Sequence, residues 1–251
     1  MEPGFHLRFD PPTDDLADFV ESIGTFHNNL PNDKEIVVLP DGRVDLFFWK
    51  QPGEPIRIIL IGLETEPEQR FVPPGVMAYV ISFKPLAVEY ILKYPIAAIV
   101  NTARELNNDF WDLDFTEFTD FNSFYQKISD KVISLLPEFV DERKRRLFQM
   151  IYTSSGEMPV SELSDKTGWS SRQINRYFNQ WLGLSLKAYC TILRFRASLS
   201  HIARGKLFPK LSFSDQNHFI KQVKKFSGVV PKELNKNKND RFVLLSVLKR
   251  S

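Results

Sequence analysis

The polar side chains between residues 172 and 180 have the types and spacing needed to read DNA bases. An arginine guanidinium can donate two hydrogen bonds to O6 and N7 of guanine, and an asparagine or glutamine amide pairs similarly with N6 and N7 of adenine. This stretch contains no acidic residue that would repel phosphate. Its candidate base-reading residues are Arg172, Gln173, Asn175 and Arg176.

A second stretch, residues 214–228, repeats this pattern at a displacement of 45 residues (219 − 174). The apolar positions correspond in pairs: Ile174 with Phe219, Phe178 with Val223, and Trp181 with Phe226. In the same register Arg176 corresponds to Lys221. An internal repeat of this kind predicts two similar structural units. The candidate reading residues of the second unit are Gln216, Asn217 and Lys221.

The elements that position the first set can be predicted from the surrounding residues. Residues 160–167 have the apolar spacing of a short helix, Gly168 suits a left-handed turn, and Ser170 or Ser171 can cap a following helix. That second helix carries one complete apolar stripe: Ile174, Tyr177, Phe178, Trp181 and Leu182. A short helix, a glycine turn and an amphipathic helix predict a helix-turn-helix. The alternative is an ordinary solvated helix of a bundle.

A long helical stretch, residues 185–204, separates the two candidate units. At about 1.5 Å per residue it spans roughly 30 Å. Two reading helices that enter successive major grooves must lie about 34 Å apart. The stretch therefore has the length of a linker helix between two helix-turn-helix units.

Residues 145–234 resemble the AraC-type helix-turn-helix domain. The resemblance lies in these segments: Val160-Ser-Glu-Leu, Gly168-Trp-Ser, Arg172-Gln-Ile-Asn-Arg-Tyr-Phe, Gly183-Leu-Ser, Arg194-Phe-Arg-Ala-Ser-Leu, Phe213-Ser-Asp-Gln-Asn-His-Phe and Phe226-Ser-Gly-Val-Val-Pro. In that family two helix-turn-helix units flank a linker helix. The resemblance implies base-facing side chains at Arg172, Asn175, Arg176, Gln216, Asn217 and Lys221.

The second unit departs from the family pattern in its supporting helix. Only seven residues separate Gly205 from Phe213, and Pro209 lies among them. A proline lacks the backbone donor and disfavours a helical residue before it. We therefore expect a supporting helix of one turn or none. In its place Phe208, Leu211 and Phe213 are expected to pack against the second reading helix.

The N-terminal part has the alternation and turn residues of a small β-barrel. Apolar, β-branched runs are separated by Pro-Gly and Pro-Asp-Gly turns, and they cover residues 35–39, 43–49, 56–63 and 76–83. Helical spacing follows at 86–94 and 121–136. Two stretches, Leu39-Pro-Asp-Gly-Arg-Val-Asp-Leu and Ile81-Ser-Phe-Lys-Pro, resemble the cupin-like sensing domain of some AraC-type regulators. The fold class expected for the whole chain is α+β: a cupin-like barrel with helices, then an all-α part.

The charge is divided unevenly along the chain. Residues 1–140 hold 11 Lys and Arg against 23 Asp and Glu, a balance of −12, and residues 141–251 hold 22 against 8, a balance of +14. This asymmetry is expected when one half meets a polyanion. The predicted domains are an acidic sensing or dimerisation domain, residues 1–137, and a basic DNA-binding domain, residues 138–251.

The remaining composition excludes several classes of protein. The single cysteine excludes an internal disulfide, no apolar run is long enough for a membrane span, and the first ten residues lack the features of a secretory signal. The four histidines show no spacing typical of a metal site. We therefore expect a cytoplasmic protein that is not an enzyme and needs no cofactor.

The sequence predicts a sequence-specific DNA-binding transcription regulator. Its expected partners are double-stranded DNA, RNA polymerase, a small-molecule effector and a second copy of the chain. Two alternatives remain open at this point. One is a protein-interaction module with a degenerate helix-turn-helix that no longer reads DNA. The other is an enzyme that uses the N-terminal barrel.

Overall fold

A computed structural model describes residues 4–113, 118, 120–208 and 215–249. The strands are β1 (Phe5–Asp10), β2 (Val20–Asn28), β3 (Lys34–Val38), β4 (Val44–Lys50), β5 (Arg57–Ile61), β6 (Glu68–Val72), β7 (Met77–Phe83) and β8 (Ala103–Leu106). The helices are α1 (Leu86–Tyr90), α2 (Phe121–Ser134), α3 (Glu142–Thr153), α4 (Val160–Thr167), α5 (Ser171–Leu182), α6 (Leu186–Ala203), α7 (Gln216–Ser227), α8 (Pro231–Lys236) and α9 (Val243–Leu248). Short 3₁₀ turns lie at Asp14–Leu16, Ala97–Ile99, Phe110–Asp112 and Lys238–Asp240. The α+β class, with strands before helices, is confirmed.

The strands form two antiparallel sheets. Six pair in the order β1-β2-β7-β4-β5-β8, and β3 pairs with β6 in a separate two-stranded sheet. Within the described residues these pairings leave the larger sheet open, whereas the sequence predicted a small barrel. The antiparallel β content of the N-terminal part is thus confirmed, and its closure into a barrel is not observed.

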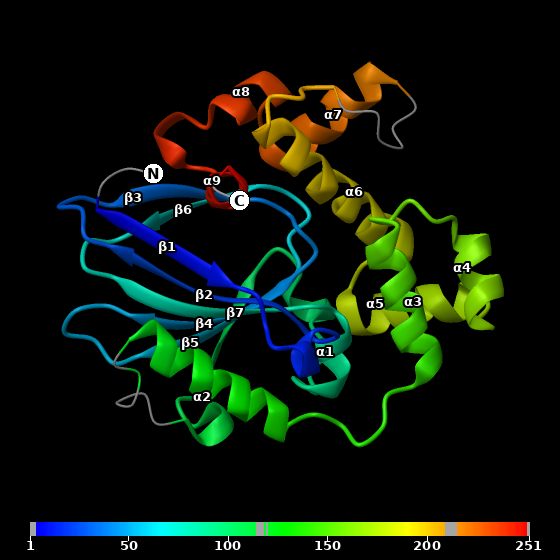
Figure 1. Cartoon of the computed structure of the whole chain (residues 1–251), viewed down its shortest axis with the longest axis horizontal. Coiled ribbons are helices and arrows are strands. Elements are labelled where there is room, and N and C mark those ends of the chain that lie inside the picture. The colour runs from blue at the N-terminus through cyan, green and yellow to red at the C-terminus, as the bar shows by residue number, and fades with distance from the viewer. Residues whose placement is uncertain (1–3, 114–117, 119, 209–214, 250–251) are drawn as a thin grey trace.

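The larger sheet buries different residues on its two faces because successive side chains of a strand point in opposite directions. Phe48 of β4 and Tyr79 of β7 pack against Phe124 of α2, with ring centroids 5.6 and 4.6 Å from it. Figure 1 shows α2 running along this side of the sheet. Phe47 and Val80, their neighbours in sequence, belong to the opposite face and line a cavity.

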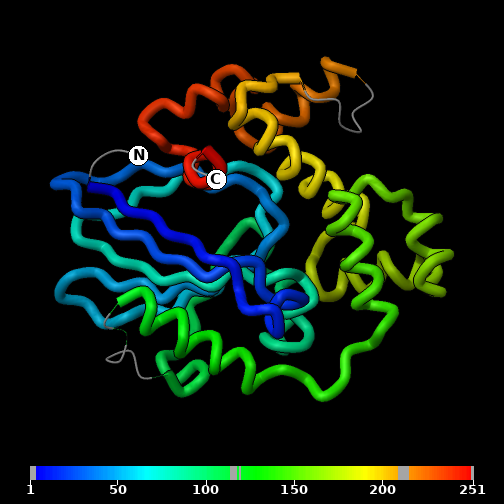
Figure 2. The backbone as a smooth tube through the Cα atoms, viewed as in Figure 1, coloured from blue at the N-terminus to red at the C-terminus, as the bar shows by residue number. Residues whose placement is uncertain are grey.

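The long helix α6 organises the C-terminal part, residues 142–249. Figures 1 and 2 show α3, α4 and α5 at one end of α6, and α7 and α8 at the other. The chain then returns to the sheets through α9, which lies beside β3. There the backbone N–H of Val37 donates to the carbonyl of Arg241 at 2.7 Å. The predicted linker helix is confirmed, with Ser185 as its N-cap.

Buried contacts join the C-terminal part to the N-terminal part. The Tyr189 hydroxyl of α6 donates to the carbonyl of Gly42 at 3.0 Å, and the backbone N–H of Ile96 donates to the carbonyl of Trp181 at 2.9 Å. One continuous cluster of buried apolar residues runs from the sheet into α3, α5 and α6. The predicted domain boundary lies in the loop between α2 and α3, and the assignment of separate roles to the two parts stays a prediction.

Candidate nucleic-acid interface

The first helix-turn-helix, α4 and α5, has the local geometry that its sequence predicts. Gly168 ends α4 with φ of 66°, a left-handed conformation that favours glycine because it has no Cβ. Ser170 then caps α5: its side chain accepts from the backbone N–H of Gln173, and the Gln173 side chain accepts from that of Ser170. The apolar stripe of α5 faces the protein interior, where three of its side chains are fully buried: Ile174, Phe178 and Leu182.

The opposite face of α5 is exposed. Arg172, Gln173 and Arg176 lie on it, and so do Asn179 and Gln180. Arg172 and Arg176 are four residues apart, so their side chains are neighbours on one face of the helix. The structure records no ion pair for either arginine among the residues that it describes. Both guanidinium groups are therefore available to an acceptor outside the protein.

The side chains of Asn175 and Gln173 lie near the polar face of α5, and both form hydrogen bonds within the protein. The Asn175 side chain donates to the carbonyl of Ser171 at 2.9 Å and accepts from the backbone N–H of Leu186 at 3.2 Å. It thus ties α5 to the first residue of α6. The Gln173 oxygen is engaged in the cap of α5, at 2.9 Å from the Ser170 nitrogen. A base contact by Asn175 would require its amide to leave both partners.

We expect Asn175→Ala to destabilise the protein by about 1–3 kcal/mol, because the buried N–H of Leu186 would lose its acceptor. Asn179→Ala, which changes an exposed amide on the same helix, is the matched control and should stay within about 0.5 kcal/mol of the parent. Chemical denaturation of the two variants measures both changes. Equal free energies of unfolding would show that the Asn175 bridge is not formed in solution.

The helix predicted as the second reading helix, α7, is capped by Asp215, whose side chain accepts from the backbone N–H of His218 at 2.8 Å. The predicted residues Gln216, Asn217 and Lys221 are all exposed. Lys224 and Lys225 extend the basic face by one turn. Neither lysine is among the residues predicted from the sequence, although their positions three and four residues after Lys221 place them on the same face of the helix.

The support of this second unit differs from that of the first. Residues 204–208 form no helix, and residues 209–214 lie outside the described part of the chain. The ring of Phe208 contacts that of Phe219 edge-on, with centroids 6.5 Å apart, yet 54% of Phe208 is exposed. The predicted contact of Phe208 with α7 is therefore observed, but Phe208 is not buried. Leu211 and Phe213 lie outside the described residues, so their predicted packing stays a prediction.

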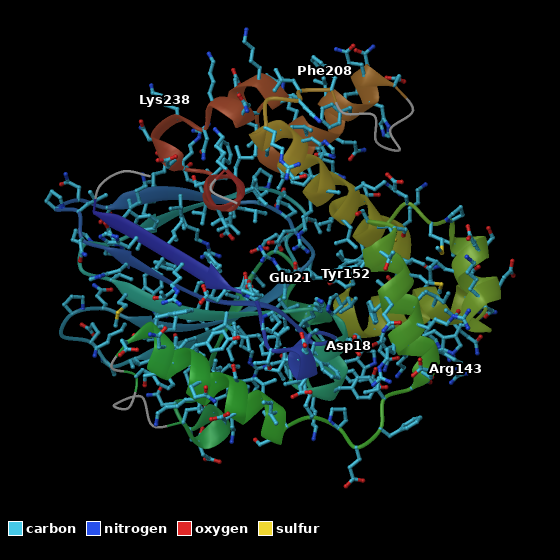
Figure 3. All side chains as sticks on the ribbon, viewed as in Figure 1. Asp18, Glu21, Arg143, Tyr152, Phe208 and Lys238 are labelled. Carbon is cyan, nitrogen blue, oxygen red and sulfur yellow. The ribbon has the colours of Figure 1, made fainter. Side chains whose placement is uncertain are left out.

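The basic run at the start of α3 is largely engaged within the protein. Arg143 pairs with Asp141 at 2.7 Å, Lys144 with Glu89 at 2.6 Å, and Arg145 with Asp18 at 3.1 Å. Figure 3 places Arg143 at the base of α3 and Asp18 across from it on the N-terminal part. The balance of +14 therefore overstates the positive charge that is free to meet phosphate. The exposed basic side chains without a recorded ion pair in the described residues include Arg172, Arg176, Lys187, Lys221, Lys224 and Lys225.

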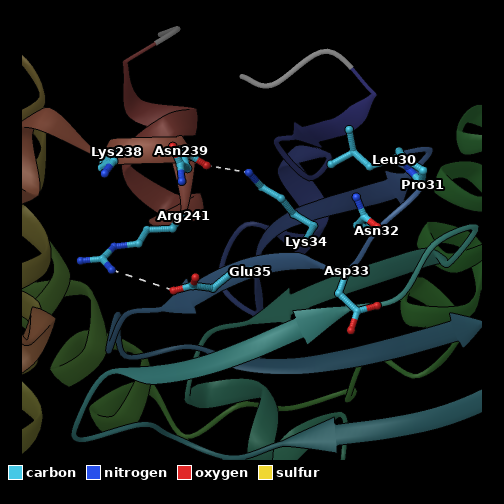
Figure 4. A pocket seen from close by; sticks show the side chains of 9 residues that line it. All are labelled: Leu30, Pro31, Asn32, Asp33, Lys34, Glu35, Lys238, Asn239 and Arg241. Atoms are coloured by element: carbon cyan, nitrogen blue, oxygen red, sulfur yellow. Dashed lines mark hydrogen bonds and ion pairs between the residues drawn. The ribbon is translucent and has the colours of Figure 1, made fainter.

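The C-terminal segment also contacts the N-terminal part beside a polar cavity of about 590 Å³. There the Lys34 ammonium donates to the carbonyl of Asn239 at 2.6 Å, and Arg241 lies 3.9 Å from Glu35. Figure 4 shows both contacts bridging the segment between α8 and α9 and the strand β3. Together with the bond from Val37, they attach the segment that follows α7 and α8 to the two-stranded sheet.

Glu64 is a buried acid in the N-terminal part with two further carboxylates, Asp41 and Asp45, near it. Burial first, and then the negative charges of Asp41 and Asp45, raise the pKa of Glu64 to about 9. The folded protein therefore keeps a proton on Glu64 that the unfolded chain releases above pH 4.5. Its contribution to stability is present at low pH and is lost as the pH rises towards 9.

Glu64→Gln is accordingly expected to stabilise the protein at pH 8, by at least about 1 kcal/mol, because glutamine is neutral at every pH. The difference from the parent should shrink towards zero at pH 4. Urea denaturation at both values measures it. A difference that does not change with pH would contradict the protonated state of Glu64.

None of the described helices has both the length and the apolar character needed to cross a membrane. A family model described as Domain of unknown function (DUF6597) matches residues 8–105, which cover most of the strands. The curated proteins contain no match to this chain.

Solved structures of ToxT from Vibrio cholerae are similar to this chain over most of both lengths. An apo ToxT variant is 13% identical, with 94% of this chain and 98% of that chain covered and a TM-score of 0.42. ToxT bound to (E)-4-(8-methylnaphthalen-1-yl)but-3-enoic acid is 14% identical, with coverages of 96% and 98% and a TM-score of 0.41. At these low values we base the function on this chain's own residues.

Proposed function

We propose that this chain is a sequence-specific DNA-binding transcription regulator. The observation that carries the proposal is the exposed face of α5. Arg172, Gln173 and Arg176 project from a helix that is capped at Ser170 and packed through Phe178. No acidic residue lies between 171 and 183. Such a face combines the donors that recognise guanine and adenine with the positive charge that phosphate requires.

The two units contribute differently in this proposal. α5 has a complete supporting helix, so its arginines are held at a fixed depth and read bases directly. Residues 204–208, before α7, form no helix, so we assign Lys221 mainly to phosphate. α6 spans about 27 Å at roughly 1.5 Å per residue, which suits two helices in successive major grooves.

Control of the DNA-binding part is assigned to the N-terminal part, through a small-molecule effector or through association with a second copy of the chain. The contact of Tyr189 with Gly42 supports this assignment because it joins the linker helix to the sheet. A regulator of this kind acts by contacting or obstructing RNA polymerase, so polymerase is part of the proposal. The cytoplasm is the compartment in which we expect it to work.

A gel-shift experiment with the full chain tests the proposal. Double-stranded genomic fragments are titrated at about 50 and 200 mM salt, because phosphate contacts release counterions and make affinity fall with salt. We expect a subset of fragments to bind, with affinity at least tenfold weaker at the higher salt. Absence of binding, or binding indifferent to salt, would contradict the proposal and favour a protein-interaction module.

A further inference from the structure

A cavity of about 260 Å³ lies between the larger sheet, the strand β3 and the helix α9. Most of its lining is apolar. The sheet contributes aromatic and aliphatic side chains from four strands, and α9 covers the cavity with further aliphatic ones; they include Phe9, Phe26, Phe47 and Val80, then Val247 and Leu248. At about 30 Å³ per water in the liquid, the space suits a molecule on the order of ten heavy atoms.

One side of this cavity is polar. Ser82 of β7 lies directly opposite Ser22 of β2 on one side and opposite Asp45 of β4 on the other. All three line the cavity and form a row across three neighbouring strands. Directly opposite residues have Cβ atoms about 4.5–5.5 Å apart, so a group beside Asp45 also lies close to Ser82. Ser22 and Asp45 are two strand spacings apart, about 9.5 Å, so they serve different parts of a ligand.

Two atoms of this row lack a hydrogen-bond partner within the described part of the chain. They are Ser22 Oγ and Asp45 Oδ1, and both are buried from solvent. A buried polar atom without a partner costs about 1–3 kcal/mol, and a charged one costs more. The row therefore offers a hydroxyl and a carboxylate oxygen to a donor that the protein does not supply.

The charges around the row favour a positively charged donor. Arg43 is held by Asp41, whose Oδ2 accepts from Arg43 Nε at 2.6 Å, and Arg196 of α6 is held by Glu21. Each guanidinium that lines the cavity thus has its own carboxylate, and Asp45 is the carboxylate in excess. Lys84 lies 3.9 Å from the second oxygen of Glu21 and does not line the cavity.

The raised pKa of Asp45 agrees with its place as the carboxylate that has no guanidinium of its own. Burial raises this pKa, the positive charge of Arg43 opposes the rise, and the negative charge of Asp41 adds to it, so that the resulting pKa is about 6. Near pH 7.5 the carboxylate is thus mostly ionised while it remains buried. An ammonium group beside it would offset the hydration that burial removes, because an opposite charge favours the ionised form of the carboxyl.

We propose that this cavity binds a small molecule with a compact apolar body and a protonated amine, whose ammonium group donates to Asp45 Oδ1. The apolar body lies among Phe47, Val80 and the side chains of α9. The inference rests on the proposed function only in naming this molecule the effector of the regulator. Binding itself requires no DNA.

The position of the cavity explains how such a molecule would act on the DNA-binding part. Arg196 of the linker helix lines the polar side, and α9, which follows the second helix-turn-helix unit, forms the cover. A bound amine therefore contacts both parts of the protein at once. Its binding would change the positions of α6 and α9 relative to the sheet.

Calorimetric titration of the full chain at pH 7.5 tests the ligand class. The probes are 2-phenylethylamine, its neutral isostere 2-phenylethanol, and 3-phenylpropanoate, which has a similar body and the opposite charge. We expect the amine to bind at least tenfold more tightly than the alcohol, and the acid to bind least. Asp45→Asn should weaken binding of the amine at least tenfold and leave binding of the alcohol unchanged.

Asp15→Asn, which removes an exposed carboxylate outside the cavity, is the matched control and should bind the amine as the parent does. Circular dichroism melting of each variant establishes that it is folded. Tighter binding of the acid would overturn the proposal and assign the arginines to an anion. Equal binding of the amine by Asp45→Asn, or no binding of any probe, would overturn it too. DNA binding is measured separately, so failure of one proposal is distinguishable from failure of the other.

Discussion

Replacing Arg172 and Arg176 together by alanine is expected to weaken binding to the preferred DNA site by roughly 30-fold to 10⁴-fold. Each guanidinium that grips a guanine edge with two hydrogen bonds contributes about 1–3 kcal/mol of discrimination. Both side chains are exposed and without a recorded ion pair in the described residues, so their loss should leave the fold intact. Fluorescence anisotropy with a labelled duplex measures the affinity.

The matched control removes two arginines from the N-terminal part, Arg8 and Arg57. Their side chains are about half exposed and pair with the surface carboxylates Asp10 and Glu105. Arg8 also donates to Asn122 at 3.2 Å and lies over the ring of Phe121, so circular dichroism is used to establish that this variant is folded. The double substitution changes the net charge by the same amount and should alter DNA affinity by less than about threefold, because these arginines lie outside the reading helices. Equal losses in both variants would mean that DNA responds only to net charge, and α5 would not be the reading helix.

Gly183→Ala is expected to destabilise the protein far more than Gly168→Ala. Both glycines end a helix of the first unit in a left-handed conformation, with φ of 72° and 66°. That conformation alone costs alanine about 1–2 kcal/mol. A Cβ at Gly168 meets nothing within 4 Å, whereas one at Gly183 would lie 2.7 Å from Val100 and 2.8 Å from the Cα of Ala97.

The expected cost is therefore about 1–2 kcal/mol at Gly168 and about 2–5 kcal/mol at Gly183, since overpacking adds roughly 1–3 kcal/mol. Urea denaturation measures the difference. It tests whether the first helix-turn-helix is held against the N-terminal part, because Ala97 and Val100 belong to that part. Similar free energies of unfolding for the two variants would indicate that α5 is not docked there in solution.

The first helix-turn-helix could be predicted almost residue by residue because its determinants are local. The apolar stripe, the turn at Gly168 and the cap at Ser170 all lie within a few residues of the helices that they define. The same holds for α6, which spans Leu186–Ala203 within the predicted stretch 185–204. Local patterns of this kind carry the physical signal of a helix.

Contacts between distant residues could not be predicted in this way. Asn175 looks like a reading residue in the sequence, and only the structure shows its bonds to Ser171 and Leu186. The basic run of α3 looks free, yet the partners of Lys144 and Arg145 are Glu89 and Asp18, far away in sequence. The polar row across β2, β7 and β4 depends on strand register, which a single sequence does not specify.

The strands β1, β2, β6 and β8 were also missed. β2 contains Gly24 and several polar residues, and β6 mixes polar and charged residues with little alternation. Their pairing partners stabilise them, because β propensity depends mainly on packing against neighbouring strands. The cavity, which β1 and β2 help to line, was therefore beyond what the sequence alone could indicate.

Selection of duplexes from a randomised library by the full chain tests the central claim most directly. The parent protein, Arg176→Ala and Lys221→Ala are each taken through selection and sequencing. We predict that the parent enriches a defined motif, that Arg176→Ala relaxes the preference at one base pair, and that Lys221→Ala keeps the motif while binding all sequences more weakly. Failure of the parent to enrich any motif would contradict the account, and so would a change of base preference in Lys221→Ala alone.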